Sequence, residues 1–427
     1  MWELIQSNRR KSFILFIFMG ICLVALGYVI GFAFLSEGGG ITGIFIALAI
    51  WFILSMISYF SGSSILLAAS KAKEVTHDVH PQLFNVVEEM KISANLPAMP
   101  KIYIIPDPAP NAFATGMKPE KSAVAVTAGL LSRLNRDELQ GVVAHEMSHI
   151  INRDVLYVTF AGIMLGSIVI ISEVFLRGMF YSSMSSRRYR SSSSRGGGGQ
   201  AQLIIMVVAI VLAILAPILA RLLYFAISRK REYLADASAV RLTRYPEGLA
   251  SALEKISQSN LDLASANKVT APMYIANPLK KKGRKLSNLT STHPPITERI
   301  KILRNISQGV NFKDYQNAYA LAIGKSARII PASGLKDTNE IPIRKAKAER
   351  PEERGKKKSM RDIGDLVRKV NKYAFLLCVC GLKIKVPPDF KKHEITCPRC
   401  GHKNEVPLAE LTAAVAAAGS IPGTKNK

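Results

Sequence analysis

Cysteine, tryptophan and acidic residues are scarce in this chain of 427 residues. It has five cysteines, two tryptophans, and 31 Asp and Glu against 57 Lys and Arg. Four cysteines fall between Cys378 and Cys400 and the fifth, Cys22, lies in an apolar run, which excludes a secreted disulfide scaffold and favours a reducing compartment. The shortage of acid leaves a net charge of +26, which suits a surface facing anionic lipid or, less specifically, nucleic acid.

Apolar residues are abundant and clustered. The chain is 48% hydrophobic with a mean hydropathy of +0.17, which excludes a disordered protein. An ordinary soluble enzyme is also excluded, because the apolar excess is concentrated in a few long runs.

The first two runs, residues 13–35 and 41–67, carry no charge over a length that spans a bilayer. We expect a transmembrane hairpin over residues 1–70. The first run is too long for the apolar part of a signal peptide and lacks an Ala-x-Ala cleavage pattern.

Two further apolar runs, at about 155–176 and 201–220, predict two more membrane segments. The alternative is a buried helix pair inside the protein. The basic residues that flank the first hairpin place both of its ends in the cytoplasm. An arginine-rich loop between runs three and four conflicts with the same rule and leaves the topology of the second pair open.

The segment from 71 to 154 has the pattern of a folded α+β domain. A helix is expected near 81–92, strands at 101–105, 111–115 and 122–127, and then a helix that begins at Asn135 with Glu138 in a capping box. Residues 250–324 read as mostly helical, and 326–372 as a basic linker with room for one short helix.

The last helix of that segment carries an H-E-x-x-H motif formed by His145, Glu146 and His149. Its spacing places both imidazoles on one helix face, where they can share a zinc ion, with the glutamate beside them. The alternative, two surface histidines on an ordinary helix, requires a chance match among only seven histidines. We therefore expect a catalytic zinc site that needs a third ligand.

Glu232 and Asp236 supply a candidate for the rest of the site. Glu232 can bind the metal, while Asp236, one helical turn later, can hydrogen-bond the free ring nitrogen of a ligand histidine. Taken alone, this pattern also fits a solvated charged helix face. Its position favours the metal site, because Glu232 follows the fourth apolar run just as His149 precedes the third.

Residues 1–305 resemble the M48 family of integral-membrane zinc metalloproteases, and in particular its heat-shock protease HtpX-like branch. The resemblance is carried by the hairpin, the stretch 111–116, the H-E-x-x-H motif, the motif at 231–236 and the Ser-Thr-His-Pro at 291–294. It implies a minigluzincin-like domain on the cytoplasmic side of the cell membrane, within residues 71–325. It also implies residue roles: Glu146 as general base, His293 holding substrate or oxyanion, zinc ligands His145, His149 and Glu232, and a substrate-binding strand at Asn111, Ala112, Phe113 and Ala114.

A second metal site is expected near the C-terminus, in a module at 373–410 that precedes a tail at 411–427. Cys378 and Cys380 form a C-x-C, and Cys397 and Cys400 a C-x-x-C. Four thiolates close the coordination of one structural zinc ion, as in a zinc ribbon. The alternative is four unligated cytosolic thiols.

The sequence thus predicts a multi-pass α-helical membrane protein with an α+β minigluzincin-like zinc metalloprotease domain and a small C-terminal zinc ribbon. We expect a zinc endopeptidase of protein quality control and the stress response, acting on misfolded or damaged membrane proteins. The expected partners are unfolded or membrane proteins and the lipid bilayer, with nucleic acid ranked below them, and the sequence sets no oligomeric state. The competing hypothesis is a catalytically idle membrane scaffold that recruits partners through the ribbon.

Overall fold

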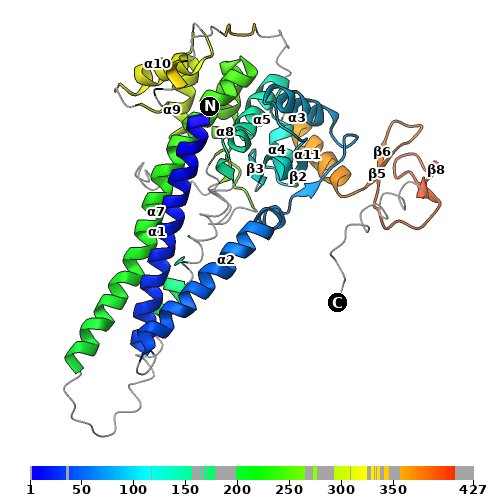
Figure 1. The fold of residues 1–427 in the computed structure, drawn as a ribbon. Coiled ribbons are helices and arrows are strands. Elements are labelled where there is room, and N and C mark those ends of the chain that lie inside the picture. Colours follow the sequence, from blue (N-terminus) through cyan, green and yellow to red (C-terminus); the bar gives the residue numbers. More distant parts are fainter. Residues whose placement is uncertain are drawn as a thin grey trace.

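The computed structural model has three parts: a group of long apolar helices, an α+β domain at one end of them, and a small C-terminal module (Figure 1). The α+β domain contains the H-E-x-x-H motif for which catalysis is expected, and it is named the catalytic domain for that expectation. The tail at 411–427 and most of the third apolar run lie outside the part of the chain that the structure describes. The described residues are 2–34, 38–116, 118–155, 165, 168–169, 171–177, 199–264, 273–276, 293–307, 309–324, 328–330, 332, 334–336, 341–345 and 356–408.

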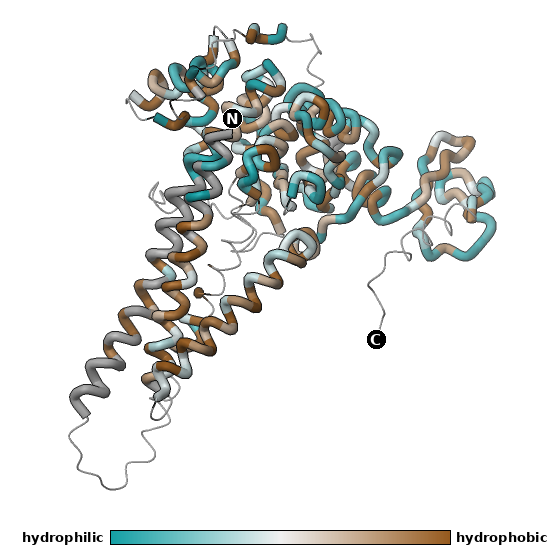
Figure 2. The backbone as a smooth tube through the Cα atoms, viewed as in Figure 1, coloured by the Kyte–Doolittle hydropathy of each residue, from teal (hydrophilic) through white to brown (hydrophobic). Residues whose placement is uncertain are grey.

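Helices α1 (Trp2–Phe34) and α2 (Gly39–Ala69) pack against each other as an antiparallel pair. Figure 2 shows the hydrophobic colouring that follows the described part of both helices. Glycines set their close approach: a Cβ at Gly43 would lie 2.1 Å from the carbonyl oxygen of Gly27, and one at Gly31 would lie 2.2 Å from that of Gly39. Within the described residues, α2 is the one helix long and apolar enough to cross a membrane, and α1 holds a shorter apolar stretch, Phe16–Phe32.

Helix α7 (Gly199–Thr243) joins the apolar helices to the catalytic domain. Its 45 residues contain both the fourth apolar run and the motif around Glu232, and at 1.5 Å per residue they span about 67 Å. It packs against α1 and also against α5 (Arg136–Ile151). From the third run, Ile168 and Phe175 are buried against α1.

The catalytic domain is built on one mixed sheet of β1 (Lys73–Glu74), β2 (Lys101–Ile105), β3 (Ala112–Gly116) and β4 (Ser122–Thr127). The strand order is β1-β2-β4-β3, with β2 and β4 parallel and the other pairs antiparallel. Three strands and the α+β character lie where the sequence predicts them, β3 shifted by one residue.

Helices α3 (Pro81–Ser93) and α5 bury their apolar sides in one core with alternate residues of β2 and β4. The opposite sides of these strands pack on the end of α2 at Leu67 and on Tyr274. Helix α5 begins with the expected capping box, in which Asn135 and Glu138 bond each other's backbone N–H groups. Helices α8 (Pro246–Ser257), α9 (Ile296–Arg304) and α10 (Phe312–Ile323) extend the core, and the short helices are α4 (Ala128–Leu131), η1 (Pro119–Lys121) and η5 (Gly334–Lys336).

The stretch expected to be a linker differs from that expectation. Helix α11 (Lys356–Val370) packs on the catalytic core, with Ile363 6% exposed and Val370 7% exposed, and Ile330 is fully buried in the same core. Spacings of three and four residues place Ile363, Leu366, Val367 and Val370 on one helix face. The described parts of 328–370 therefore belong to the catalytic domain.

Two hairpins form the C-terminal module: β5 (Ala374–Leu377) with β6 (Lys383–Val386), and β7 (Glu394–Thr396) with β8 (Lys403–Glu405). The module is tied to α11 through Asp365, which lies 3.1 Å from the Nζ of Lys383 and 2.7 Å from that of Lys385.

Candidate active site

Helix α5 presents three side chains of the H-E-x-x-H motif at the centre of the domain. His145 is fully buried, Glu146 is 1% exposed, and the side chain of His149 is 14% exposed. The Nε2 atoms of the two histidines lie 3.3 Å apart. The i, i+4 spacing therefore aims both rings at one point.

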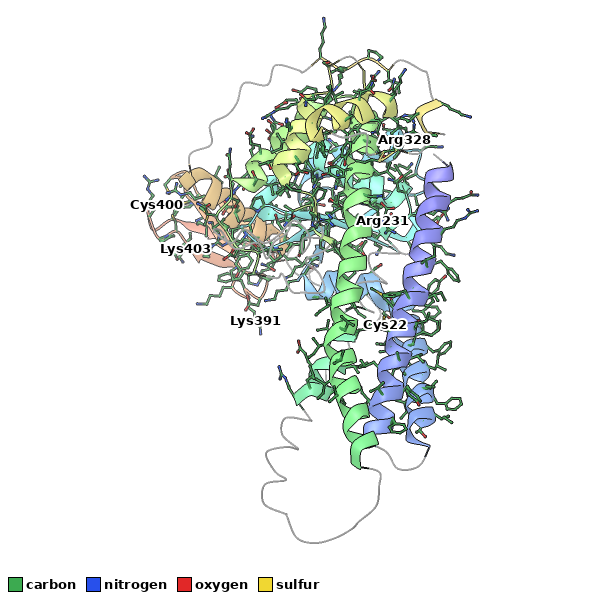
Figure 3. The ribbon with its side chains drawn as sticks, turned by 90° about the vertical axis from the view of Figure 1, so that its left-hand side faces the viewer. Cys22, Arg231, Arg328, Lys391, Cys400 and Lys403 are labelled. Atoms are coloured by element: carbon green, nitrogen blue, oxygen red, sulfur yellow. The ribbon has the colours of Figure 1, made fainter. Side chains whose placement is uncertain are left out.

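Glu232 reaches the same point from α7. Its Oε2 lies 3.6 Å from His145 Nε2, and its Oε1 lies 3.5 Å from His149 Nε2. Figure 3 labels Arg231, the residue before it, on the part of α7 that enters the domain. Three donors at these separations fit the corners of a tetrahedral site, since bonds of about 2.0–2.2 Å place neighbouring donors roughly 3.3–3.5 Å apart. The donor set, two imidazoles and one carboxylate, is one that zinc binds.

The charges of the site suit a cation. Burial alone would raise the pKa of Glu232, but His293, His145, His149 and Arg299 outweigh burial and lower it, so the carboxylate stays ionised. Burial would lower the pKa of His145, yet hydrogen bonds with Asp236 and Glu232 raise it to about 9. The buried carboxylates thus favour positive charge on the imidazoles. A metal ion bound to the imidazoles can supply this charge in place of protons.

Each histidine of the motif contacts a buried carboxylate through its Nδ1 atom. Asp236 Oδ1 lies 2.9 Å from His145 Nδ1, which is the contact that the sequence predicts. Asp154 Oδ2 lies 3.2 Å from His149 Nδ1, and Asp154 is fully buried. Such contacts fix the tautomer and direct Nε2 toward the metal. Asp154 was not singled out by sequence, because it belongs to no spacing pattern.

Arg299 on α9 is the second residue that the sequence does not reveal. It is fully buried, and its guanidinium donates to both oxygens of Asp236 at 2.8 and 2.7 Å and to the carbonyl oxygen of Ile275 at 3.0 Å. Ile275 in turn donates its backbone N–H to Ala112 on β3. Arg299 therefore links the support of the metal site to the strand beside it.

Glu146 is the one acidic side chain of the site that binds neither a histidine nor an arginine. Neither of its buried carboxylate oxygens makes a hydrogen bond of full geometry among the described residues, although the backbone N–H of Ala114 lies close enough to act on its charge. Burial raises its pKa, while the neighbouring histidines and the backbone N–H of Ala114 work in the opposite direction. A carboxylate held in this way beside a metal site can exchange a proton with water or substrate.

His293 is brought to the same cluster from the loop before α9. It is 4% exposed, and its Nε2 lies 3.9 Å from Glu232 Oε2. Burial lowers its pKa to about 4, so the imidazole is neutral near pH 7 and one ring nitrogen can donate a hydrogen bond.

Strand β3 lies at the edge of the four described strands, next to α5. Asn111 exchanges hydrogen bonds with Thr127, in part through the threonine hydroxyl. By antiparallel alternation, the backbone groups of Ala112, Ala114 and Gly116 point to the outer edge. Ala112 is partnered there by Ile275, which leaves the backbone of Ala114, beside Glu146, facing the site. Phe113 is buried on the opposite side against Tyr274.

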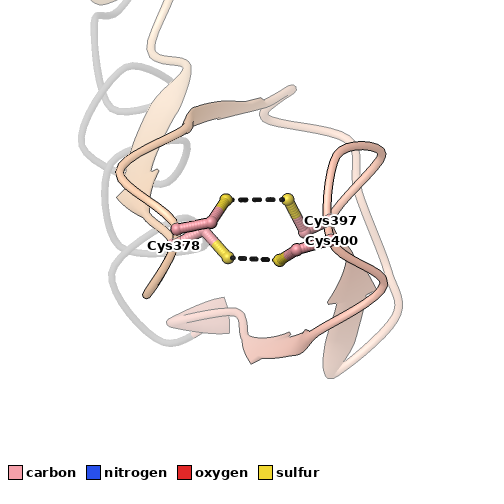
Figure 4. Close-up of side chains that lie close together, drawn as sticks. Cys378, Cys397 and Cys400 are labelled. Carbon is pink, nitrogen blue, oxygen red and sulfur yellow. Dashed lines mark hydrogen bonds between the residues drawn. The ribbon is translucent and has the colours of Figure 1, made fainter.

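The four C-terminal cysteines also converge (Figure 4). The Sγ atoms of Cys378 and Cys400 lie 3.6 Å apart, and those of Cys380 and Cys397 lie 3.7 Å apart. A disulfide requires about 2.05 Å, whereas sulfurs bound to one tetrahedral zinc at about 2.3 Å are separated by roughly 3.7–3.8 Å. The backbone N–H of Cys380 lowers the pKa of Cys378 and favours its thiolate. The cluster fits a metal ion and not a pair of disulfides.

Comparison with known proteins places this geometry in a family. The model of peptidase family M48 matches residues 77–307. A protease HtpX homolog of Dictyoglomus turgidum is 47% identical over 308 residues, which cover 72% of this chain and 95% of that protein. The corresponding homolog of Listeria monocytogenes serovar 1/2a is 45% identical over 307 residues, which cover 72% of this chain and all of that protein.

Among solved structures, the crystal structure of S. mikatae Ste24p matches with a TM-score of 0.38 and 20% sequence identity, covering 71% of this chain and 67% of that one. The C-terminal module lies beyond the residues that the family model matches.

Proposed function

Because this chain belongs to peptidase family M48 and is a membrane zinc metalloendopeptidase of protein quality control, we propose that His145, His149 and Glu232 hold its catalytic zinc ion. Asp236 and Asp154 fix the two imidazoles, and Arg299 fixes Asp236. When bound there, zinc supplies a Lewis acid that polarises a peptide carbonyl and acidifies water.

Glu146 performs the proton transfers. Its unpartnered, buried carboxylate takes a proton from the attacking water and delivers it to the nitrogen of the departing amine. Burial raises its pKa toward neutrality, which suits a group that must both accept and release a proton. This residue also disfavours the idle-scaffold hypothesis, since a purely structural metal site needs no non-ligating carboxylate in a dry pocket.

An extended substrate pairs with the outer edge of β3. The backbone groups of Ala114 point toward Glu146, so a strand added there passes directly over the metal donors. His293 donates a hydrogen bond to the carbonyl oxygen of the scissile bond. Backbone pairing makes little demand on side chains, which suits unfolded or damaged membrane proteins as substrates.

The observation that carries the proposal is the convergence of three metal donors on one point with Glu146 beside them. The test is cleavage of casein by detergent-purified protein with zinc, with a chelator, and in Glu146→Gln. We expect cleavage that requires zinc and that falls at least about 100-fold in the variant, because the general base is lost. Glu88→Gln, which alters an exposed glutamate on α3, should retain activity. Full activity in Glu146→Gln would refute the assignment.

The proposal includes the membrane arrangement. Helices α1 and α2 form a spanning hairpin, and the third and fourth apolar runs form two further spans at about 155–176 and 201–220. Arg9, Arg10 and Lys11 before the first span and Lys71 and Lys73 after the second hold the catalytic domain on the cytoplasmic side.

The C-terminal module carries a second, structural zinc ion on its four cysteines. Two short hairpins bury too little apolar surface to fold without such a staple. We expect two zinc ions per wild-type chain and one in the double variant Cys378→Ser/Cys397→Ser, measured by elemental analysis. Two zinc ions in the double variant would contradict this site.

A further inference from the structure

The C-terminal module lies beside the catalytic domain. Helix α11 buries Ile363 and Val370 in the catalytic core, and Asp365 on the same helix pairs with Lys383 and Lys385 of β6. Helix α11 therefore contacts both the catalytic core and the C-terminal module.

The point of attachment lies where α2 leaves the apolar helices. The Nζ of Lys73 donates to the Oδ1 of Asn371. Lys73 follows the last residue of α2, Ala69, by four residues, and Asn371 precedes β5 by three. Since extended chain covers at most about 3.6 Å per residue, Lys73 lies within about 15 Å of the end of a proposed membrane span, and the module begins three residues after its partner Asn371.

Basic residues dominate this region. Residues 356–408 contain 13 Lys and Arg against five Asp and Glu, a net charge of +8. Lys383 and Lys385 pair with Asp365, and Lys403 pairs with Glu394. Lys391 and Lys392 are exposed in the loop between β6 and β7, and none of the ion pairs within the described residues includes them.

That loop is on the membrane side of the module. In Figure 3 the apolar helices run downward from the catalytic domain, and Lys391 lies lower than Cys400 and Lys403. The exposed apolar residues Leu377 and Val379 flank Cys378 in the other loop. Lys391, which no ion pair within the described residues includes, thus lies on the membrane side of the module.

We propose that Lys391 and Lys392 bind the anionic phospholipid headgroups of the membrane that α2 spans, so that the C-terminal module rests on the lipid surface beside α2. Clustered lysines near a membrane span are attracted to anionic lipid, and the attraction falls off within a Debye length. The inference rests on the proposed span of α2 and does not depend on the peptidase chemistry.

The test compares lysine reactivity in the full-length protein in nanodiscs of phosphatidylcholine alone and of phosphatidylcholine with phosphatidylglycerol. Acetylation of each lysine is followed by mass spectrometry after brief treatment with an activated ester. We expect acetylation of Lys391 and Lys392 to slow about fivefold or more with phosphatidylglycerol, which corresponds to the attraction of one lysine for an anionic surface. Added salt should restore the rate. Lys403, whose side chain is 73% exposed, is the internal control and should react equally in both nanodiscs.

Equal rates at Lys391 and Lys392 in the two nanodiscs would overturn the proposal. The proposal would also be overturned if single-stranded RNA, but not phosphatidylglycerol, slowed the acetylation of Lys391 and Lys392. That result would show that these lysines bind nucleic acid.

The double variant Lys391→Gln/Lys392→Gln supplies a second readout. We expect acetylation of neighbouring Lys385 to slow with phosphatidylglycerol in the wild type but not in the double variant, while zinc content stays at the wild-type value. Persistence of that slowing in the double variant would place the lipid contact elsewhere.

Discussion

Asp154 and Asp236 support the two proposed ligand histidines, His149 and His145, to different degrees. Asp236 is shared with Arg299, whereas Asp154 contacts His149 through a single oxygen at 3.2 Å. Loss of such a contact typically lowers metal affinity 10- to 100-fold. The structure therefore makes Asp154 a position where metal binding can be weakened without removal of a ligand.

We predict that Asp154→Ala lowers zinc affinity by about 10- to 100-fold. Asp154→Asn should lower it less, because the amide oxygen can still accept from His149 Nδ1–H. Competition with a chromogenic chelator measures both affinities. Asp314→Asn, at the start of α10, is the matched control and should match wild type. Unchanged affinity in Asp154→Ala would show that the contact does not position His149.

Arg299 supports a prediction about stability. Removal of one partner of a buried ion pair leaves the other charge uncompensated, which costs about 3–5 kcal/mol. We therefore expect Arg299→Met to lower the free energy of unfolding by roughly that amount, and Asp236→Asn in the same chain to recover part of it. Arg304→Met on the same helix is the control. Its pairs with Glu247 and Glu254 are exposed to solvent, so its loss should cost under about 1 kcal/mol. Chemical denaturation of the wild type and the three variants measures the free energies of unfolding. Equal losses in Arg299→Met and Arg304→Met would contradict the argument.

At this scale the sequence reveals residues that obey a spacing rule and misses those that do not. His145, Glu146 and His149 are fixed by an i, i+4 pattern on one helix, and Glu232 and Asp236 by the same spacing on another. Asp154 follows the end of α5 and Arg299 comes from α9, 154 positions beyond His145. Their roles depend on how separate elements pack, which no local pattern encodes.

At the scale of the element, the close packing of α1 on α2 requires glycine at the positions where the two backbones meet. A Cβ at Gly43 would meet the backbone of Gly27 at 2.1 Å, where nothing can move aside cheaply. A Cβ at Gly20 would instead meet the side chain of Trp51 at 3.1 Å, which can shift by a few tenths of an ångström.

We predict that Gly43→Ala lowers the thermal stability of the detergent-purified protein, while Gly20→Ala leaves it nearly unchanged. Overpacking of a tight contact typically costs about 1–3 kcal/mol. Circular dichroism on heating measures the difference. A Gly43→Ala protein that melts with the wild type would show that the two helices can separate without loss.

The elements themselves divide into those that the sequence predicts well and those that it does not. The strands of the catalytic sheet show apolar β-rich runs bounded by turn residues, and the Asn135 capping box is a local signal, so these are found to within one residue. The sequence does not show whether the helix of the fourth apolar run, 201–220, continues into the motif at 231–236. Only the structure shows that α7 is unbroken from residue 199 to 243.

At the scale of the molecule, the run of basic residues at the start of α11 hides the role of this helix. Charge over 354–358 indicates a solvated linker, while the four apolar residues that share one face of α11 are outnumbered in any composition count. In the fold they face the catalytic core, and Ile363 and Val370 are buried there. The catalytic domain therefore ends after α11, and the C-terminal module begins at β5.

Truncation tests this boundary. We predict that a chain ending at residue 373 melts close to the full-length protein, because the ion pairs of Asp365 that it loses are partly exposed and worth little. A chain ending at residue 345 also loses Ile363 and Val370 from the core. Full burial of each contributes about 1.5–3 kcal/mol, so this chain should melt several degrees lower.

Ile363→Asp in the full-length protein should reproduce that loss of stability. Met360→Asp, at a residue 58% exposed on the same helix, should not. Equal melting temperatures of the two truncated chains would show that α11 does not stabilise the catalytic domain and acts as a linker.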